Sequence, residues 1–182
     1  GILLGASFGG TVTQSDSARI QIRGQHYEQG GGTFQGGTND WILNGGNFTC
    51  TGGTFNAGAS QRIVIPQTFV ADGNCFNPQS STVFFQSQGA TLVITNIGPA
   101  DLVFYRFWAG NWSTSTDRNL EIRSGTTVRV LNRMVLTNSA PTRGLVINGP
   151  GLIRVEGDLW VDGASYHSGN GTIRVEGTGD QT

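Results

Sequence analysis

The chain has 182 residues, including 29 glycines, only 13 % charged residues and a formal net charge of −1 at pH 7. All 11 basic residues are arginine, which excludes chemistry that needs a lysine, such as a Schiff base or a P-loop phosphate site. The lack of a basic field argues against a nucleic-acid partner, and no apolar run of about 18 residues predicts insertion into a membrane.

The first 30 residues are the least regular part of the sequence. The opening GILLGASFGG, residues 1–10, lacks the basic start of a signal sequence and carries the apolar residues Ile2, Leu3, Leu4 and Phe8. We expect residues 1–30 to form an N-terminal cap or a strand that joins another copy head to tail. The start without methionine and the end in GTGDQT also fit a processed product or a segment cut from a longer chain, whose neighbouring coils would supply the pairing.

Short motifs recur at a nearly constant spacing. GGTF at residues 31–34 returns at residues 52–55, 21 positions later, with GGNF at residues 45–48 between them. GLIRVEG at residues 151–157 returns as GTIRVEG at residues 171–177, 20 positions later. This period predicts the coil of a β-solenoid, in which glycine marks the corners and phenylalanine forms a stacked ladder inside. A β-sandwich with coincidental spacing is the competing interpretation.

Alternation of apolar and polar residues predicts the strands. In LIRVEGDLWVD, residues 152–162, the side chains expected to face inward are Ile153, Val155, Leu159 and Val161. No segment shows an apolar period of 3.6 residues with caps at both ends. We therefore expect one all-β domain, residues 1–182, with almost no α-helix, in which residues 31–182 form regular coils and the whole chain about eight or nine coils of about 20 residues.

Residues 40–110 resemble a known family. The segments DWILNGGNFTCTGGTFNAGASQRIVI, CFNPQSSTVFFQSQGATLVI and LVFYRF are similar to the W-x-N-G-G-x-F-x-x-G, S-S-T-V-x-F and F-Y-N-L elements of bacterial extracellular β-helix repeat proteins. Those proteins are large, secreted, surface-displayed chains, related in style to autotransporter and filamentous adhesins. This chain departs from the pattern at Arg106, where the family usually has asparagine. The resemblance implies a single-stranded, right-handed parallel β-helix outside the cell that acts as a scaffold or adhesin.

The run LVFYRFWAGNW, residues 102–112, is apolar on both parities. Alternation predicts one face with Phe104, Arg106 and Trp108, and another with Val103, Tyr105 and Phe107. One face must be core, and the other is either covered by a loop or forms a lateral interface or glycan platform. The candidates for that surface are Tyr105, Trp108, Trp112 and Trp160.

The two cysteines, Cys50 and Cys75, are 25 positions apart, a little more than one coil. In a secreted chain such a pair predicts a disulfide between adjacent coils, with two buried free thiols as the alternative. Three N-x-S/T sequons, at Asn47, Asn111 and Asn170, would matter only in a host that glycosylates them.

The repeated heptads also place charged side chains on the outer face. Glu176 is expected one coil beyond Glu156, at about 4.8 Å, where Arg154 and Arg174 would join both acids in a solvated ladder of diagonal pairs. The alternative is an acidic edge that binds calcium or a sugar, since some parallel β-helices are polysaccharide lyases or glycosidases.

The sequence contains no pattern of residues typical of a metal site. His26 and His167 have no second histidine or cysteine at ligand spacing, so we predict no metal site, no cofactor and no catalytic residue.

Together these features predict a structural or adhesive protein at the cell surface that is not an enzyme. It would self-associate head to tail into a filament or form part of a long surface protein, with a glycan or a host cell surface as a further contact. A carbohydrate-binding or carbohydrate-active β-helix is the alternative.

Overall fold

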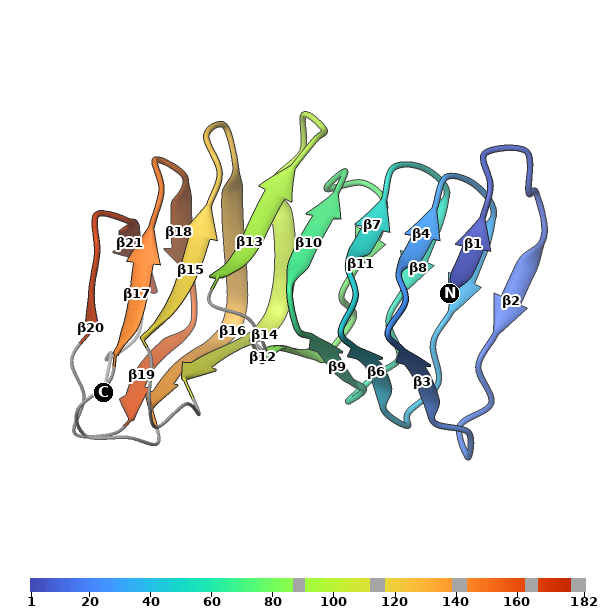
Figure 1. The fold of residues 1–182 in the computed structure, drawn as a ribbon, viewed down its shortest axis with the longest axis horizontal. Coiled ribbons are helices and arrows are strands. Elements are labelled where there is room, and N and C mark those ends of the chain that lie inside the picture. The colour runs from blue at the N-terminus through green and yellow to red at the C-terminus, as the bar shows by residue number, and fades with distance from the viewer. Residues whose placement is uncertain (87–90, 112–116, 139–143, 163–166, 178–182) are drawn as a thin grey trace.

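The computed structural model describes residues 1–86, 91–111, 117–138, 144–162 and 167–177. These residues form strands joined by turns, and every strand pair among them is parallel (Figure 1). The chain winds into a β-solenoid of about six turns, and its first sheet has eight strands. The predicted all-β solenoid is confirmed, with fewer full turns than the eight or nine expected.

Three parallel sheets form the walls of the stack. The first contains β1 (Ile2–Leu4), β4 (Tyr27–Gln29), β7 (Phe48–Cys50), β10 (Thr68–Ala71), β13 (Thr91–Asn96), β15 (Arg118–Ile122), β17 (Leu145–Asn148) and β20 (His167–Ser168). The second contains β2 (Thr11–Thr13), β5 (Thr33–Gln35), β8 (Thr54–Asn56) and β11 (Phe76–Asn77). The third contains β3 (Ile20–Arg23), β6 (Trp41–Asn44), β9 (Arg62–Ile65), β12 (Thr82–Gln86), β14 (Leu102–Asn111), β16 (Thr127–Asn138), β18 (Leu152–Val155), β19 (Asp158–Asp162) and β21 (Thr172–Val175).

Two aromatic ladders fill the interior of the N-terminal half. The first consists of Tyr27, Phe48 and Phe69, and the second of Phe34, Phe55 and Phe76, with each step 21 positions long. The ring centroids of Phe48 and Phe69 are 4.7 Å apart and the ring planes differ by 5°. Between the ladders, Phe48 and Phe55 meet edge to face at 5.1 Å. The predicted ladder of stacked rings is confirmed, and it is double.

The glycine pairs of the GGTF motifs form stacked corners. Gly32 and Gly53 have φ angles of +64° and +72°, in the left-handed region that residues with a Cβ atom rarely adopt. A Cβ atom on Gly53 would lie 2.3 Å from the carbonyl oxygen of Gly32 on the preceding coil. Both the turn and the close stacking of coils therefore require glycine at residue 53.

The length of a coil varies along the stack. In the first sheet Phe48 lies opposite Phe69, 21 positions later, whereas Leu92 lies opposite Leu120, 28 positions later. We expected a uniform coil of about 20 residues. The coils of the aromatic ladders and the last heptad repeat have this length, but the coils between these two regions are longer. The second sheet ends at β11, and the coils after it contain the long strands β14 and β16 of the third sheet. Strand β16 pairs with β18 along its first half and with β19 along its second half.

A register shift in the pairing of β14 with β16 changes which residues of the aromatic run face the core. It lies between Phe104 and Arg106, and it leaves both Phe104 and Phe107 fully buried in the core. Tyr105 is half-buried and Arg106 is exposed. The prediction that Phe104 shares a face with Arg106, and Tyr105 with Phe107, was therefore wrong, because strict alternation fails at a β-bulge.

The two heptads occupy the same position on successive coils. Ile153 lies opposite Ile173 and Val155 lies opposite Val175, and both Ile153 and Val155 are fully buried. Val161, which was expected to face inward, is 51 % exposed. Its strand β19 pairs only with β16, so no described strand packs beyond it.

Candidate functional site

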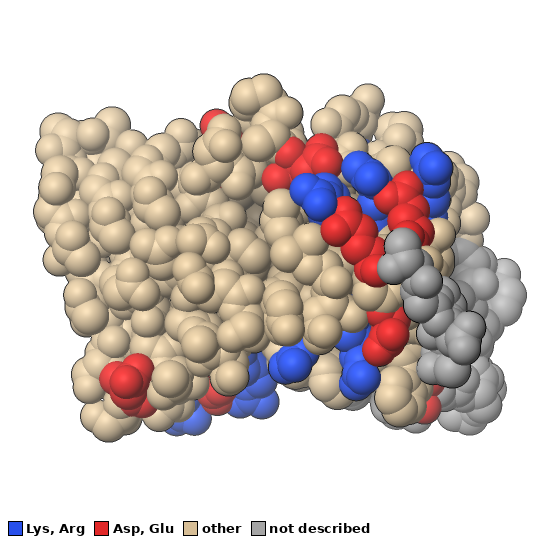
Figure 2. All heavy atoms as spheres, turned by 180° about the vertical axis from the view of Figure 1, so that it is seen from behind, with Lys and Arg blue, Asp and Glu red and all other residues tan. Residues whose placement is uncertain are grey.

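A ladder of charged side chains lies on the outer side of β16, β18 and β21. Arg129, Arg154 and Arg174 are directly opposite one another, and each of the first two reaches diagonally to the next coil. Arg129 donates a hydrogen bond from Nε to Oε1 of Glu156 at 2.7 Å, and Arg154 donates from Nη2 to Oε2 of Glu176 at 2.7 Å. Figure 2 shows the charged side chains gathered over the C-terminal half of this face. The predicted diagonal pair of Arg154 with Glu176 is present, whereas Glu156 pairs with Arg129, which the prediction did not include, and Arg174 pairs with Glu176 along its own strand.

These hydrogen bonds lower the pKa of both glutamates. The bond from Arg129 holds the pKa of Glu156 below its usual value, and the bond from Arg154 does the same for Glu176. The described residues contain no group of three or more His, Cys, Asp or Glu side chains that could hold a metal ion. Glu156 and Glu176 in this ladder thus each form an ion pair with an arginine.

A different arrangement occupies the outer side of the third sheet. Strands β12, β14, β16 and β19 place Phe84, Trp108, Val135 and Trp160 directly opposite one another, as an apolar column. Neighbouring positions in such a column are about 4.8 Å apart. The rings of Phe84 and Trp108 stack with their centroids 4.8 Å apart and their planes 26° from parallel. One face of the Trp108 indole is therefore covered by Phe84, and the other is turned toward Val135.

Arginines flank this column. Two residues before Trp108 on β14, Arg106 donates a hydrogen bond from Nε to Oδ1 of Asn132 at 2.9 Å, and its guanidinium lies 5.3 Å from the centre of the Tyr105 ring. In the part of the chain that the structure describes, no carboxylate forms an ion pair with Arg106. Among the described residues its guanidinium thus contacts an amide and a ring, both of which are uncharged.

The next arginine in the same row is Arg133, opposite Arg106 on β16. It donates from Nη2 to Oδ2 of Asp158 at 3.5 Å, a long contact, and its guanidinium carbon lies 5.4 Å from the centre of the Trp160 ring. Because Arg133 is one strand before Trp160, it lies on the side of the indole that is turned toward Trp108. A guanidinium in this position is attracted by the aromatic ring and keeps its remaining donors available.

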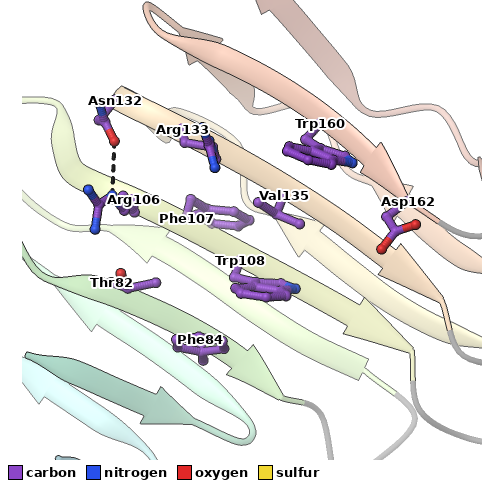
Figure 3. Close-up of a pocket in the computed structure, with 10 residues that line it drawn as sticks. All are labelled: Thr82, Phe84, Arg106, Phe107, Trp108, Asn132, Arg133, Val135, Trp160 and Asp162. Atoms are coloured by element: carbon purple, nitrogen blue, oxygen red, sulfur yellow. Dashed lines mark hydrogen bonds between the residues drawn. The ribbon is translucent and has the colours of Figure 1, made fainter.

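These columns line a cleft of about 610 Å³ (Figure 3). Figure 3 shows Trp108 and Trp160 on either side of Val135, with the arginines toward the start of the strands and Asp162 toward their end. Its lining consists of Thr82, Phe84, Arg106, Phe107, Trp108, Asn132, Arg133, Val135, Trp160 and Asp162. The cleft thus combines an aromatic floor with a cationic side and a polar side.

Of the four aromatic residues predicted for a lateral surface, the structure brings Trp108 and Trp160 together in this cleft. Tyr105 lies outside the cleft, against Arg106. Trp112 lies outside the described residues. The sequence prediction missed Phe84 and Arg133, which join the cleft only because successive coils bring them beside Trp108.

The two cysteines form a disulfide. Cys50 ends β7 and Cys75 precedes β11, and their Cα atoms are 6.0 Å apart. Cys50 lies opposite Ala71, which shares a coil with Cys75, so the bond joins neighbouring coils. Both side chains are buried beside the aromatic ladders.

The apolar residues at the start of the chain belong to the first coil. Ile2 and Phe8 pack against the core, and Leu4 is buried. Next to β4, Ile2 donates its backbone N–H to the carbonyl of His26, and the carbonyl of Leu4 accepts the N–H of Gly30. Because successive residues of a strand direct their backbone groups to opposite sides, the N–H and C=O of Leu3 point away from β4, and the Leu3 side chain is 71 % exposed.

In the described segments of the chain, no helix is long and apolar enough to cross a membrane. Comparisons of the sequence with models of protein families and with curated proteins, and of the fold with solved structures, give no match.

Proposed function

We propose that this β-solenoid is an extracellular structural and adhesive element, part of a long surface protein or of a head-to-tail filament, and that it is not an enzyme. The observation that carries the proposal is the outward-facing cleft with Trp108, Trp160 and two arginines. Exposed aromatic rings beside arginine are enriched where proteins contact partners. A rigid stack of parallel coils holds these groups at fixed spacing, which suits binding to an extended surface.

The location outside the cell is supported by the bond between Cys50 and Cys75. Disulfides of this structural kind persist in oxidising compartments and are rare in reducing ones. The resemblance of residues 40–110 to bacterial extracellular β-helix repeat proteins points to the same location.

Adhesion can be tested on immobilised cell-surface polysaccharides and on host-cell surface preparations. We expect Trp108→Ala to lower retention about tenfold, since an aromatic anchor at the centre of a contact carries much of its free energy. Ile42→Ala is the matched control, because Ile42 belongs to the same column two strands before Phe84, outside the cleft. Equal retention of the Trp108 variant and the parent protein would contradict the proposal, provided that both have the same melting temperature.

Head-to-tail growth is supported by the outward backbone edge of Leu3, which pairs with no described strand. An unpaired strand edge accepts a further parallel strand, and such a contact is open-ended because it does not close on itself. Leu3→Pro removes the outward N–H and keeps β1 compatible with a strand, whereas Leu3→Ala keeps the N–H. We expect filaments in electron microscopy and fast sedimentation for the parent and for Leu3→Ala, but not for Leu3→Pro. Filaments of undiminished length in Leu3→Pro would show that this edge is not the joint.

The alternative, a carbohydrate-active β-helix, is favoured by the same cleft but lacks a pair of free acids. Glycoside hydrolysis uses two carboxyl groups about 5–10 Å apart. Among the described residues that line the cleft, Asp162 is the one carboxylate, and Glu156 is paired with Arg129. We expect no turnover of pectin-like, alginate-like or arabinoxylan substrates. Cleavage that disappears in Asp162→Ala would establish the alternative.

A further inference from the structure

We propose that the cleft binds a strand of acidic polysaccharide, with one sugar ring stacked on the open face of Trp108 above Val135 and its carboxylate on Arg106 and Arg133. The proposal rests on the adhesive function proposed above and names the chemistry of its ligand. It depends on the spacing of the rings, on the charge of Arg106 and Arg133 at the rim of the cleft, and on the width of the apolar column.

The spacing leaves one opening in the aromatic column. Phe84 and Trp108 are in contact, with 4.8 Å between their ring centres, so no ring fits between them. Trp108 and Trp160 are two strands apart, which corresponds to about 9.6 Å, and the small Val135 stands between them. A ring in van der Waals contact with planar groups on both sides needs about 7–8 Å. The opening above Val135 therefore has room for one ring of a ligand, stacked on Trp108 and bordered on the Trp160 side by the Arg133 guanidinium.

The charge of the rim favours an anionic ligand. Arg106 lies two residues before Trp108 along β14, about 6.6 Å away along the strand, and its charge has no carboxylate partner among the described residues. Among the described residues, the ion pair of Arg133 is the long contact to Asp158 at 3.5 Å. A carboxylate attached to a ring on Trp108 would reach both guanidinium groups, and a fork of N–H donors is the geometry that carboxylates prefer.

The width of the apolar column distinguishes among ligand classes. The column is one side chain wide, with the arginines on one side and Thr137 and Asp162 on the other. An amphipathic helix needs a broader apolar stripe. Two arginines, one of them in contact with Asp158, do not form the positively charged groove that follows a nucleic-acid backbone. A pyranose ring has an apolar face and hydroxyl groups around its edge, so its face matches Trp108 while its hydroxyls meet polar groups on both sides.

The apolar column is less exposed beyond the cleft. Val64 lies next to Phe84 in the same column but is only 8 % exposed, and its polar neighbour Arg62 is in the same row as Arg106. Arg62, however, is paired with Asp40. We therefore expect the acidic group to be recognised at Arg106 and Arg133 only, with neighbouring sugars lying along the sheet.

The test is binding of polygalacturonate oligosaccharides to the full chain, measured by calorimetry, with the carboxyl-reduced oligosaccharides as the neutral ligand. We expect the neutral ligand to bind at least about tenfold more weakly, and the affinity for the acidic one to fall with added salt. Arg106→Gln should weaken binding of the acidic ligand by about the same factor and leave the neutral ligand unaffected. Arg62→Gln is the matched control in the same row and should change neither.

A second variant tests the opening itself. Val135→Phe fills the space between Trp108 and Trp160 on the outer surface, so we expect it to abolish binding while the melting temperature stays equal or rises. Undiminished binding in Val135→Phe, or equal affinity for the acidic and neutral ligands, overturns the inference. Retention on cell surfaces that depends on Trp108, without affinity for the acidic oligosaccharides, would leave the adhesive function standing and refute this ligand alone.

Discussion

Phe55 contacts aromatic rings of both ladders in the interior. Its ring stacks on Phe34 and Phe76, with centroids 4.7 and 5.6 Å away, and meets Phe48 edge to face. Its side chain is fully buried. Loss of this ring would leave a cavity bordered by aromatic faces from three coils, which neighbouring side chains cannot fill without leaving their own stacks.

We expect Phe55→Ala to lower the free energy of unfolding by about 3–5 kcal/mol, the usual cost of removing a buried phenylalanine ring. Urea denaturation followed by circular dichroism measures the effect. Phe84→Ala is the control, because Phe84 stacks on the outer surface and is only partly buried. Similar costs for the two variants would contradict the central role of Phe55.

Gly53 allows a second prediction at the scale of one residue. In Gly53→Ala the added Cβ meets a backbone oxygen of the preceding coil at 2.3 Å, and the φ angle is +72°. Gly125 has nearly the same φ, +74°, but a Cβ there would meet nothing within 4 Å. We expect Gly125→Ala to cost about 1–2 kcal/mol from the backbone alone and Gly53→Ala to cost clearly more. Equal shifts in urea midpoint would show that the coils can move apart.

At the scale of the element, the disulfide fixes the position of two coils. It closes a segment of 25 positions between Cys50 and Cys75, for which the loop-entropy model gives about 3 kcal/mol. We expect reduction to lower the melting temperature without unfolding the stack at room temperature. The double variant Cys50→Ala/Cys75→Ala should no longer respond to reductant. Two titratable thiols in the native, unreduced protein would refute the bond.

The charged ladder on β16, β18 and β21 predicts a dependence on pH. Arginine lowers the pKa of Glu156 and Glu176 in the folded state, so the pairs stabilise the fold above the usual glutamate pKa of about 4.3. This contribution is lost as the pH falls through the lowered values, because the unfolded chain takes up protons first.

We therefore expect the urea midpoint to decrease on acidification below about pH 4.3. The decrease should be smaller in Glu156→Gln/Glu176→Gln than in the parent. Glu28→Gln is the control, since Glu28 is exposed on β4 and forms no ion pair with a described residue. Equal acid sensitivity of the parent and the double variant would contradict this assignment.

At the scale of the whole molecule, the sequence predicts the N-terminal interior better than the cleft. The aromatic ladders were predictable because their steps are all 21 positions, which a search for repeats detects directly. The row that contains Arg106 advances by 24 positions from Thr82 and by 27 to Arg133, so a fixed period of 20–21 cannot align it. Outer turns can vary in length without disturbing the core. The residues that meet in the cleft therefore cannot be aligned from a fixed sequence period.

The bulge explains the other failure. Alternation assigns faces correctly only while each residue advances the strand by one pleat. A single irregularity beside Phe104 reverses the faces of everything before it relative to everything after it. No residue in LVFYRF marks this position as special, and it becomes evident only when Phe104 and Phe107 are both seen in the core.

The equal 21-residue steps of the two ladders also bear on how such a chain can change its length. Between Tyr27 and Phe76, the first and second sheets advance by 21 positions at each step, whereas the third advances by 22 positions from Trp41 to Ile63 and by 20 from Ile63 to Val83. A tandem duplication of 21 residues there would insert one coil and keep both ladders in register, while the turns beside the third sheet adjust by one residue. The inserted coil would meet aromatic rings above and below, and its glycine corners would stack on copies of themselves. In this half of the molecule, unequal recombination would lengthen the protein by one coil at a time.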